Sequence, residues 1–526
     1  MLDCSRNAVM NLPALEKYIG LLSKMGYNTL MLYTEDTYEV EGEPYFGYLR
    51  GRYSKEELKR IDECCRAHGI ELVACIQTLA HLDAAVRWPC YASYTDFANI
   101  LLVGDERTYQ LIDKMFAAVA ECFGSKLVHI GMDEAHMVGL GRYLQQHGYQ
   151  NRFDILKSHL ERVIALAKKH GLEPMMWSDM FFRIATGGEY YTGNPDIITP
   201  EVAASMPEGV APVYWDYYSE DIDHYRNMLE AHAKFGRETW FAGGLWTWTG
   251  FLPHNEFSIR STRAALTACR EAGVENAIFT MWGDDGGETS FFSVLPSLYY
   301  TAQLARGVED EAQIKAGFER LIGIAFDDFM LLDLPEITCA TNANPDKYML
   351  FNDYFTGIYD PITDEGDGEK YAALASRANT LAAHPDYGYL FAEMAALCDV
   401  LAHKNDLGIR TRRAYRRGDM AAMRRLAGEY DLIAGKIEIF YERLREAWMR
   451  DNKPFGFEVQ DIRLGGLITR TTHCARRLRQ LADGEIESIE ELDAELLDPY
   501  CAPEAGVRKI CNLEWERVYV GRMVHR

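Results

Sequence analysis

Short apolar runs alternate with longer amphipathic stretches from residue 1 to about residue 306. The apolar runs have the length of buried strands, and they occupy residues 1–4, 28–36, 71–78, 126–134, 173–180, 210–218, 238–246 and 276–285. The stretches between them carry helical periodicity, and those at 12–26 and 55–69 both end in glycine, the residue that most easily forms a left-handed helix cap. Eight such β–α repeats predict a parallel sheet closed into a (β/α)₈ TIM barrel.

The pattern changes beyond about residue 330, where strand-like runs give way to helical periodicity. Examples are residues 370–384, 420–448 and 465–484. We therefore expect two domains, a barrel over 1–330 and a C-terminal α-helical domain over 331–526. The helical domain shows no chemistry of its own and is expected to be structural or to form a homodimer. Residues 340–370 are expected to be a long connection that reaches back toward the barrel mouth.

The composition restricts the kinds of partner and compartment. The chain has 526 residues and a formal net charge of −24, which disfavours nucleic acids and anionic membranes as partners. No apolar run has the length of a membrane span, and no signal peptide opens the sequence. The 12 cysteines form no CxxC pair. We therefore expect a protein of the reducing cytoplasm, with a disulfide framework disfavoured.

The predicted strands share a polarity, because each begins with apolar residues and ends in polar or aromatic ones. In a barrel of this kind the carboxyl ends of all eight strands meet at one mouth, where active sites lie. The side chains expected there are Arg6, Glu35, Asp36, Gln77, Asp133, Glu134, Trp177, Asp179, Trp215, Trp246, Trp282 and Asp284. So many carboxylates and indoles at one end of the strands indicate an active site.

The sharpest motif is KLVHIGMDEAH at residues 126–136. It resembles the H-x-G-G-D-E signature of family 20 glycoside hydrolases, the β-N-acetylhexosaminidases, with Met132 in place of the second glycine. The resemblance spans the barrel because further features recur in order. It implies an exo-acting enzyme that removes terminal β-linked GlcNAc or GalNAc from an oligosaccharide or glycoconjugate, without a cofactor or metal, and with Asp133 and Glu134 as its catalytic pair.

The same resemblance assigns substrate-binding roles to other residues. Arg6 matches an arginine that holds sugar hydroxyls, and Asp36 falls where a family aspartate partners that arginine. His81 matches the histidine of a turn after the third strand, and Asp284 takes the place of an acid that binds the outer hydroxyls. The tryptophans that match the walls of the sugar and its acetamido pocket are Trp177, Trp215 and Trp282.

The chain departs from the family pattern in two places. The family tyrosine of strand seven, which bonds the acetamido carbonyl, has no match in FAGGLWTWTGF. Either a tyrosine after strand six (Tyr214, Tyr217 or Tyr218) replaces it, with Tyr217 taken as the candidate, or Trp246 reshapes the pocket.

The small α/β domain that usually precedes the barrel is missing, and the opening strand is short, which leaves open an earlier start of the native polypeptide.

Two adjacent acids suit a reaction in which the substrate supplies its own nucleophile. An ordinary retaining glycosidase needs two carboxyl groups about 5–5.5 Å apart on opposite sides of the anomeric carbon, an arrangement that neighbouring residues on one strand do not easily give. If the acetamido oxygen attacks instead, Glu134 serves as general acid and then general base. Asp133 accepts the acetamido N–H and stabilises the oxazolinium charge.

The same residues allow other functions. MDEAH also spells the DEAH box of helicases, but the phosphate-binding loop that works with it is missing. His129, Asp133 and His136 are a candidate metal set, although no further motif completes a ligand shell. A retaining barrel glycosidase for sugars without the acetamido group, and a non-catalytic carbohydrate-binding barrel, remain as alternatives.

Overall fold

The computed structural model describes residues 1–337 and 345–497. Its core is an eight-stranded parallel sheet in the order β1-β2-β3-β6-β7-β8-β9-β10. The strands are β1 (Leu2–Asp3), β2 (Thr29–Tyr33), β3 (Glu71–Cys75), β6 (Leu127–His129), β7 (Glu173–Trp177), β8 (Ala211–Trp215), β9 (Trp240–Gly244) and β10 (Ala277–Thr280). Every predicted strand is present, each shorter than predicted because its polar end belongs to the following loop.

The sheet closes on itself between its first and last strands. The Asp3 N–H donates to the Met281 carbonyl at 3.1 Å, and the Met281 N–H donates to the Met1 carbonyl at 3.0 Å. Closure satisfies backbone groups that an open edge would leave unpaired. The predicted (β/α)₈ barrel is therefore confirmed.

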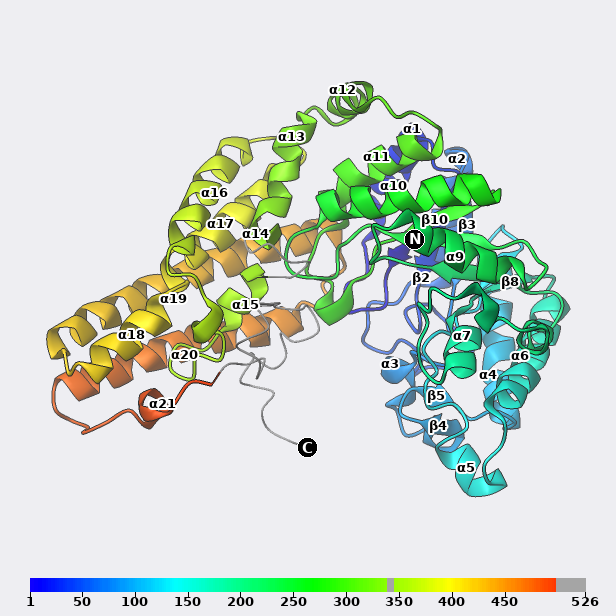
Figure 1. Cartoon of the computed structure of the whole chain (residues 1–526), viewed down its shortest axis with the longest axis horizontal. Helices are drawn as coiled ribbons and strands as arrows, with labels where there is room; N and C mark the ends of the chain where they lie inside the picture. The colour runs from blue at the N-terminus through cyan, green and yellow to red at the C-terminus, as the bar shows by residue number, and fades with distance from the viewer. Residues whose placement is uncertain (338–344, 498–526) are drawn as a thin grey trace.

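At least one helix follows each barrel strand, and the helices cover the outside of the sheet (Figure 1). These are α1 (Leu12–Met25), α2 (Lys55–Ala67), α4 (Glu106–Cys122), α6 (Arg152–Lys169), α7 (Asp179–Thr186), α9 (Ile222–Ala233), α10 (Asn255–Ala272) and α11 (Leu295–Ala305). Local sequence sets their ends. The Asn11 side chain caps the start of α1, and Gly26 ends it in the left-handed conformation that the sequence predicted, at a φ of 93°.

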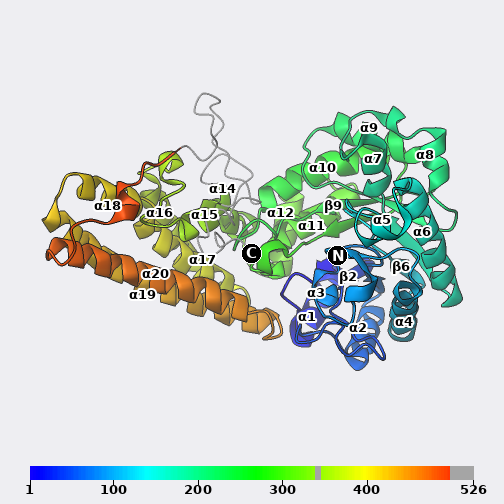
Figure 2. The same ribbon diagram turned by 90° about the horizontal axis from the view of Figure 1, so that it is seen from below.

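In the described residues after the barrel, every named element is a helix, and turns and loops connect these helices. Its longer helices are α12 (Glu311–Ile322), α16 (Asp367–Leu381), α17 (Gly388–Lys404), α18 (Leu407–Arg416), α19 (Met420–Asp451) and α20 (Glu458–Ala482). Helices α19 and α20 run side by side in the part of the molecule beside the barrel (Figures 1 and 2). The C-terminal helical domain is thus present, while its exact boundary at residue 330 stays a prediction.

Part of the segment 340–370, which the sequence predicted as a long connection reaching back toward the barrel mouth, is helical. Residues 338–344 lie outside the described part, but α15 (Pro345–Phe351) is helical, and a short 3-10 turn spans Asp360–Ile362. One residue of α15, Lys347, forms a buried ion pair with Glu288 in the loop after β10. This segment therefore contacts the barrel through a charged side chain.

Candidate active site

A pocket of about 250 Å³ opens at the carboxyl ends of the barrel strands. Its lining comes from the carboxyl ends of seven of the eight barrel strands and the loops that follow them, as expected for a barrel mouth. The lining residues are Arg6, His81, Asp133, Glu134, Trp177, Trp215, Tyr217, Tyr218, Trp248, Trp282 and Asp284. Nine of the eleven candidate site residues from the sequence are therefore gathered around one cavity.

The two adjacent acids differ in environment. Asp133 is buried, and its Oδ1 accepts a hydrogen bond of 2.7 Å from the Gln77 amide. The Glu134 side chain is 40% exposed. Burial alone would raise the pKa of Asp133, but the neighbouring His81 and the bond from Gln77 lower that pKa to about 2. Asp133 is therefore a carboxylate at neutral pH, held at the floor of the site.

His81 lies between the two acids. Its Nε2 is 3.2 Å from Asp133 Oδ2 and 3.6 Å from Glu134 Oε2. Burial would lower the pKa of His81, but the Asp133 carboxylate outweighs that effect and raises the pKa to about 9. The site thus holds an imidazolium next to the Asp133 carboxylate and the Glu134 carboxyl group.

A chain of buried hydrogen bonds joins Asp133 to the opposite side of the pocket. Gln77 Nε2 donates to Asp133 and also to the Tyr33 hydroxyl at 2.9 Å. Tyr33 donates to Glu35 Oε1 at 3.0 Å, and Arg6 Nε donates to the same oxygen at 3.3 Å. Buried polar networks of this kind fix side-chain positions when every member has a partner. Gln77 stood at a strand end in the sequence, whereas nothing in the sequence singled out Tyr33.

Asp36 does not partner Arg6, so this expectation is wrong. Arg6 pairs with Glu35 and with Asp284, whereas Asp36 is buried and bonds to Arg50 at 3.2 Å. The reason is local. Glu35 adopts a left-handed φ of 43°, which turns the chain at the end of β2 and directs the two neighbouring acids to different partners.

Trp246 is also absent from the pocket wall, and Trp248 stands there in its place. The Trp246 indole is buried behind Trp248 at a ring distance of 4.8 Å, and its Nε1 donates to the Tyr217 carbonyl at 2.9 Å. Among the tyrosines after β8, Tyr217 and Tyr218 line the pocket. Tyr214 instead donates to Asp216, outside the lining. Trp246 therefore supports the pocket without bordering it.

Aromatic rings form most of the remaining wall. Trp215 and Tyr217 are stacked at 5.2 Å, and Trp177 lies 6.2 Å from Trp282. The Arg6 guanidinium lies 5.6 Å from the Trp282 ring, which brings the hydroxyl-binding candidates and the aromatic wall into contact. Aromatic faces suit the apolar face of a pyranose, and Arg6 with Asp284 offers donors and acceptors for hydroxyls.

The metal set weighed as an alternative does not assemble among the described residues. His129 is buried, packs on Trp177 at 4.2 Å, and accepts the Gly131 N–H at Nδ1. Burial lowers the pKa of His129 to about 3. Among the described residues no group of three His, Cys, Asp or Glu side chains is placed to hold a metal ion. His129 is a neutral packing residue that supports a tryptophan of the pocket.

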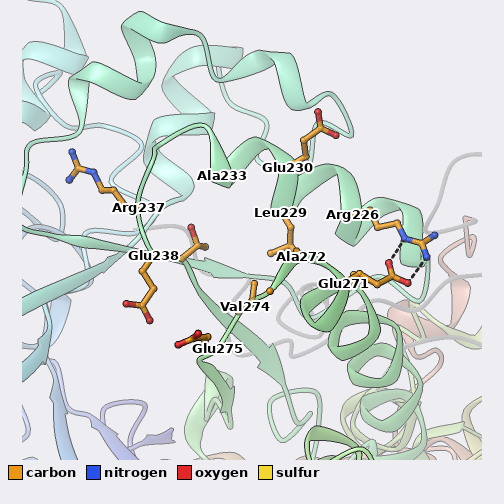
Figure 3. Close-up of a pocket in the computed structure, with 13 residues that line it drawn as sticks. Arg226, Leu229, Glu230, Ala233, Arg237, Glu238, Glu271, Ala272, Val274 and Glu275 are labelled. Carbon is orange, nitrogen blue, oxygen red and sulfur yellow. Dashed lines mark hydrogen bonds and ion pairs between the residues drawn. The ribbon is translucent and has the colours of Figure 1, made fainter.

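A second, larger hollow of about 700 Å³ lies at the opposite end of the barrel (Figure 3). It is bordered by α9, α10 and the segments that precede β9 and β10. Its floor is aliphatic, and both arginines at its rim have partners: Arg226 pairs with Glu271 at 2.7 Å, and Arg237 donates to the Met206 carbonyl at 2.9 Å. It contains neither paired acids nor an aromatic wall, so the smaller pocket is the candidate active site.

Two family models match this chain. "Glycosyl hydrolase family 20, catalytic domain" matches residues 1–199, and "Glycoside Hydrolase 20C C-terminal domain" matches residues 327–512. Among curated proteins, Hexosaminidase D of Homo sapiens is 26% identical over 340 residues, which is 59% of this chain and 66% of that protein. Hexosaminidase D of Bos taurus is 26% identical over 234 residues, 42% of this chain and 64% of that protein. The chain thus matches slightly less than two thirds of the length of each relative.

Solved structures give a more distant likeness. An exo beta-N-acetylglucosaminidase from Vibrio harveyi matches with a TM-score of 0.47 at 15% identity, over 63% of this chain and 58% of that chain. A beta-N-acetylhexosaminidase from Streptomyces coelicolor matches with a TM-score of 0.45 at 18% identity, over 62% and 69%. The family models cover the start of the barrel, with its paired acids, and most of the helical domain. The chain therefore belongs to glycoside hydrolase family 20.

Proposed function

We propose that this protein is an exo-acting β-N-acetylhexosaminidase that hydrolyses terminal β-linked GlcNAc or GalNAc by substrate-assisted, retaining catalysis. One observation carries the proposal: a buried carboxylate, Asp133, and a half-exposed neighbour, Glu134, border the same aromatic pocket. The curated relatives, which are named hexosaminidases, support the same substrate class. The pocket volume of about 250 Å³ favours one terminal sugar over an internal stretch of a chain.

In the first step Glu134 donates its proton to the glycosidic oxygen while the acetamido oxygen attacks the anomeric carbon. The bond to the leaving group breaks and an oxazolinium ion forms. Asp133 accepts the acetamido N–H and offsets the positive charge, for which its low pKa suits it. In the second step Glu134 takes a proton from water, which attacks the anomeric carbon and restores the acetamido group.

The remaining pocket residues have binding roles in this proposal. Arg6 and Asp284 hold the outer hydroxyls, and His81 keeps the two carboxylates in place. The tryptophans Trp177, Trp215 and Trp282, with Trp248, enclose the ring and its acetamido group. Tyr217, buried against Trp215, is the candidate for the bond to the acetamido carbonyl.

Two substrates test the proposal. Aryl β-N-acetylglucosaminide should be cleaved, whereas aryl β-glucoside should not, because it has no acetamido oxygen. A thiazoline mimic of the oxazolinium ion should inhibit strongly. Cleavage of the glucoside alone would favour a retaining glycosidase for sugars without the acetamido group. Binding of N-acetylglucosamine with no turnover of either substrate would favour a non-catalytic carbohydrate-binding barrel.

We also propose a cytoplasmic location and a homodimer. No helix in the described part of the chain is long and apolar enough to cross a membrane. Nine described cysteines are free, which suits a reducing compartment. Large apolar side chains on α19 and α20 are exposed, namely Leu432, Ile439 and Ile462, and they support self-association through the helical domain. Cell fractionation and sedimentation equilibrium test the two proposals.

A further inference from the structure

Asp179, directly after β7, is fully buried but does not line the pocket. Its Oδ2 accepts the backbone N–H of Glu134 at 3.0 Å and the Nε–H of Arg183 at 3.0 Å. Burying a carboxylate is costly unless it is paired and hydrogen-bonded. The position of Asp179 beneath the candidate general acid therefore needs an explanation that packing alone does not give.

The backbone at Glu134 is held in an unfavourable conformation. Its φ is +51°, and Met132, two residues earlier, has a φ of +73°. A left-handed conformation costs a residue other than glycine roughly 1–3 kcal/mol and persists where the surroundings impose it. The N–H that Asp179 accepts belongs to the peptide unit joining Asp133 to Glu134. This single hydrogen bond therefore fixes the orientation from which both acids leave the backbone.

Arg183 adds a contact to the Glu134 side chain. On α7 it lies four residues after Asp179, and its three nitrogens have separate partners. Nε bonds to Asp179, Nη1 donates to the Gly188 carbonyl at 3.2 Å, and Nη2 lies 3.4 Å from Glu134 Oε1. The planar guanidinium is thus fixed at two points and presents its third nitrogen to the general acid.

The other charged groups around this unit explain why the arginine is needed. Asp133 and Glu134 both lie near Asp179, and His136 lies near Arg183. Burial and the Asp133 charge raise the pKa of Asp179 to about 7, while Arg183 opposes that rise. Arg183 therefore offsets the repulsion of three acids crowded at one strand end.

We propose that Asp179 and Arg183 are a positioning pair that sets the direction from which Glu134 delivers its proton to the leaving group. Asp179 acts on the backbone of Glu134, and Arg183 acts on its carboxylate. This inference rests on the proposed function, since it assumes that Glu134 is the general acid. Neither residue borders the pocket, so their effect reaches the substrate through Glu134.

The leaving group separates this role from a general structural one. A phenyl leaving group needs protonation as the bond breaks, whereas a dinitrophenyl leaving group departs as a stable anion. Misplacing a catalytic group by about 1 Å costs on the order of 10²-fold in rate. For Asp179→Ala and Arg183→Met we expect kcat/KM to fall roughly 30- to 100-fold on phenyl β-N-acetylglucosaminide, and about threefold or less on the dinitrophenyl substrate.

Conservative variants sharpen the test. Asp179→Asn keeps an oxygen for the Glu134 N–H, so it should recover much of the activity that Asp179→Ala loses on the phenyl substrate. Arg183→Lys keeps the positive charge but not the planar guanidinium with its several donors. Its kcat/KM on the phenyl substrate should therefore fall between those of wild type and Arg183→Met. Arg226→Met, which removes an exposed arginine at the far end of the barrel, is the matched control and should behave as wild type on both substrates.

An equal loss on both substrates, or no loss on the phenyl substrate, would overturn the proposal. If Asp179→Ala does not fold, as judged by circular dichroism, the two Arg183 variants can be compared on the same two substrates. The Arg183 side chain is partly exposed, so its replacement should disturb folding less. Failure of the proposed function would look different. If the proposed function is wrong, wild type cleaves neither acetamido substrate. If the proposed function is right, wild type cleaves both, and the difference between the phenyl and dinitrophenyl rates of the variants tests the positioning pair.

Discussion

The imidazole of His81 is paired with Asp133, with its Nε2 3.2 Å from Asp133 Oδ2, and each group shifts the titration of the other. The pKa of His81 is raised from 6.5 to about 9, and that of Asp133 is lowered to about 2. Because these carboxylate and imidazolium groups are both charged between those limits, the contact is an ion pair across the neutral range. It holds the floor of the pocket in one arrangement.

This pair predicts a loss of stability at alkaline pH. A raised folded-state pKa contributes stability that is fully present below the unfolded value of 6.5 and is lost as the pH rises through about 9. At 1.36 kcal/mol per unit, the contribution is on the order of 3 kcal/mol. Urea unfolding of wild type and His81→Gln should differ by that order at pH 6 and converge above pH 9. A difference independent of pH would contradict the pairing.

Glu134→Gln should lose most of its turnover on substrates with poor leaving groups, because the amide cannot donate the proton that the glycosidic oxygen needs. General acid catalysis contributes about 10²–10⁴-fold. Steady-state kinetics on phenyl β-N-acetylglucosaminide measure the loss, and calorimetry with N-acetylglucosamine should show that binding persists. Glu230→Gln, an exposed glutamate on α9, is the control. Unchanged turnover in Glu134→Gln would remove this residue from its role.

Asp133→Asn should lower kcat by roughly 10²–10³-fold, the cost of removing one preorganised group that stabilises developing charge. The neutral amide no longer offsets the oxazolinium charge. The variant should also lower the pKa of His81, since burial then acts without the opposing carboxylate. Kinetics and an NMR titration of the imidazole check the two effects separately. Wild-type turnover would count against the assignment, whatever the titration shows.

The helical domain should stabilise the barrel through Glu288. This buried carboxylate, in the loop that follows β10, accepts hydrogen bonds from Gln460 at 3.0 Å and Arg463 at 2.8 Å, and it pairs with Lys347. Removing one partner of a buried ion pair costs about 3–5 kcal/mol. Glu288→Ala should therefore lower the free energy of unfolding by that amount in a denaturant titration.

Glu220→Ala is the matched control for that experiment, because Glu220 pairs with Arg260 at 2.8 Å on the exposed surface. Exposed pairs contribute about 0–1 kcal/mol, so this variant should be close to wild type. If both variants lose the same stability, the buried network contributes no more than a surface pair. The helical domain would then be attached to the barrel mainly by apolar packing.

Much of the fold and of the site was predictable from local sequence pattern. The apolar runs and glycine-terminated helices predicted all eight strands and the closed barrel, because burial and helix capping act over a few neighbouring residues. The strand ends predicted seven residues of the pocket lining, since parallel strands bring their carboxyl ends to one mouth. His81 and Tyr217 were added only by the family resemblance. The roles assigned to those residues stay predictions until the variants are measured.

Only the tertiary structure shows which polar side chains of the site contact one another. Sequence order did not reveal that Glu35, and not Asp36, meets Arg6, or that Trp248 borders the pocket while Trp246 supports it. The left-handed conformation of Glu35 at the end of β2 changes which side chain faces the mouth, and apolar periodicity does not reveal such a conformation. The bond from the Glu134 backbone to Asp179 joins residues 45 positions apart. Apolar periodicity fixes which segments are buried, but the direction of each polar side chain is set only once the loops have packed together.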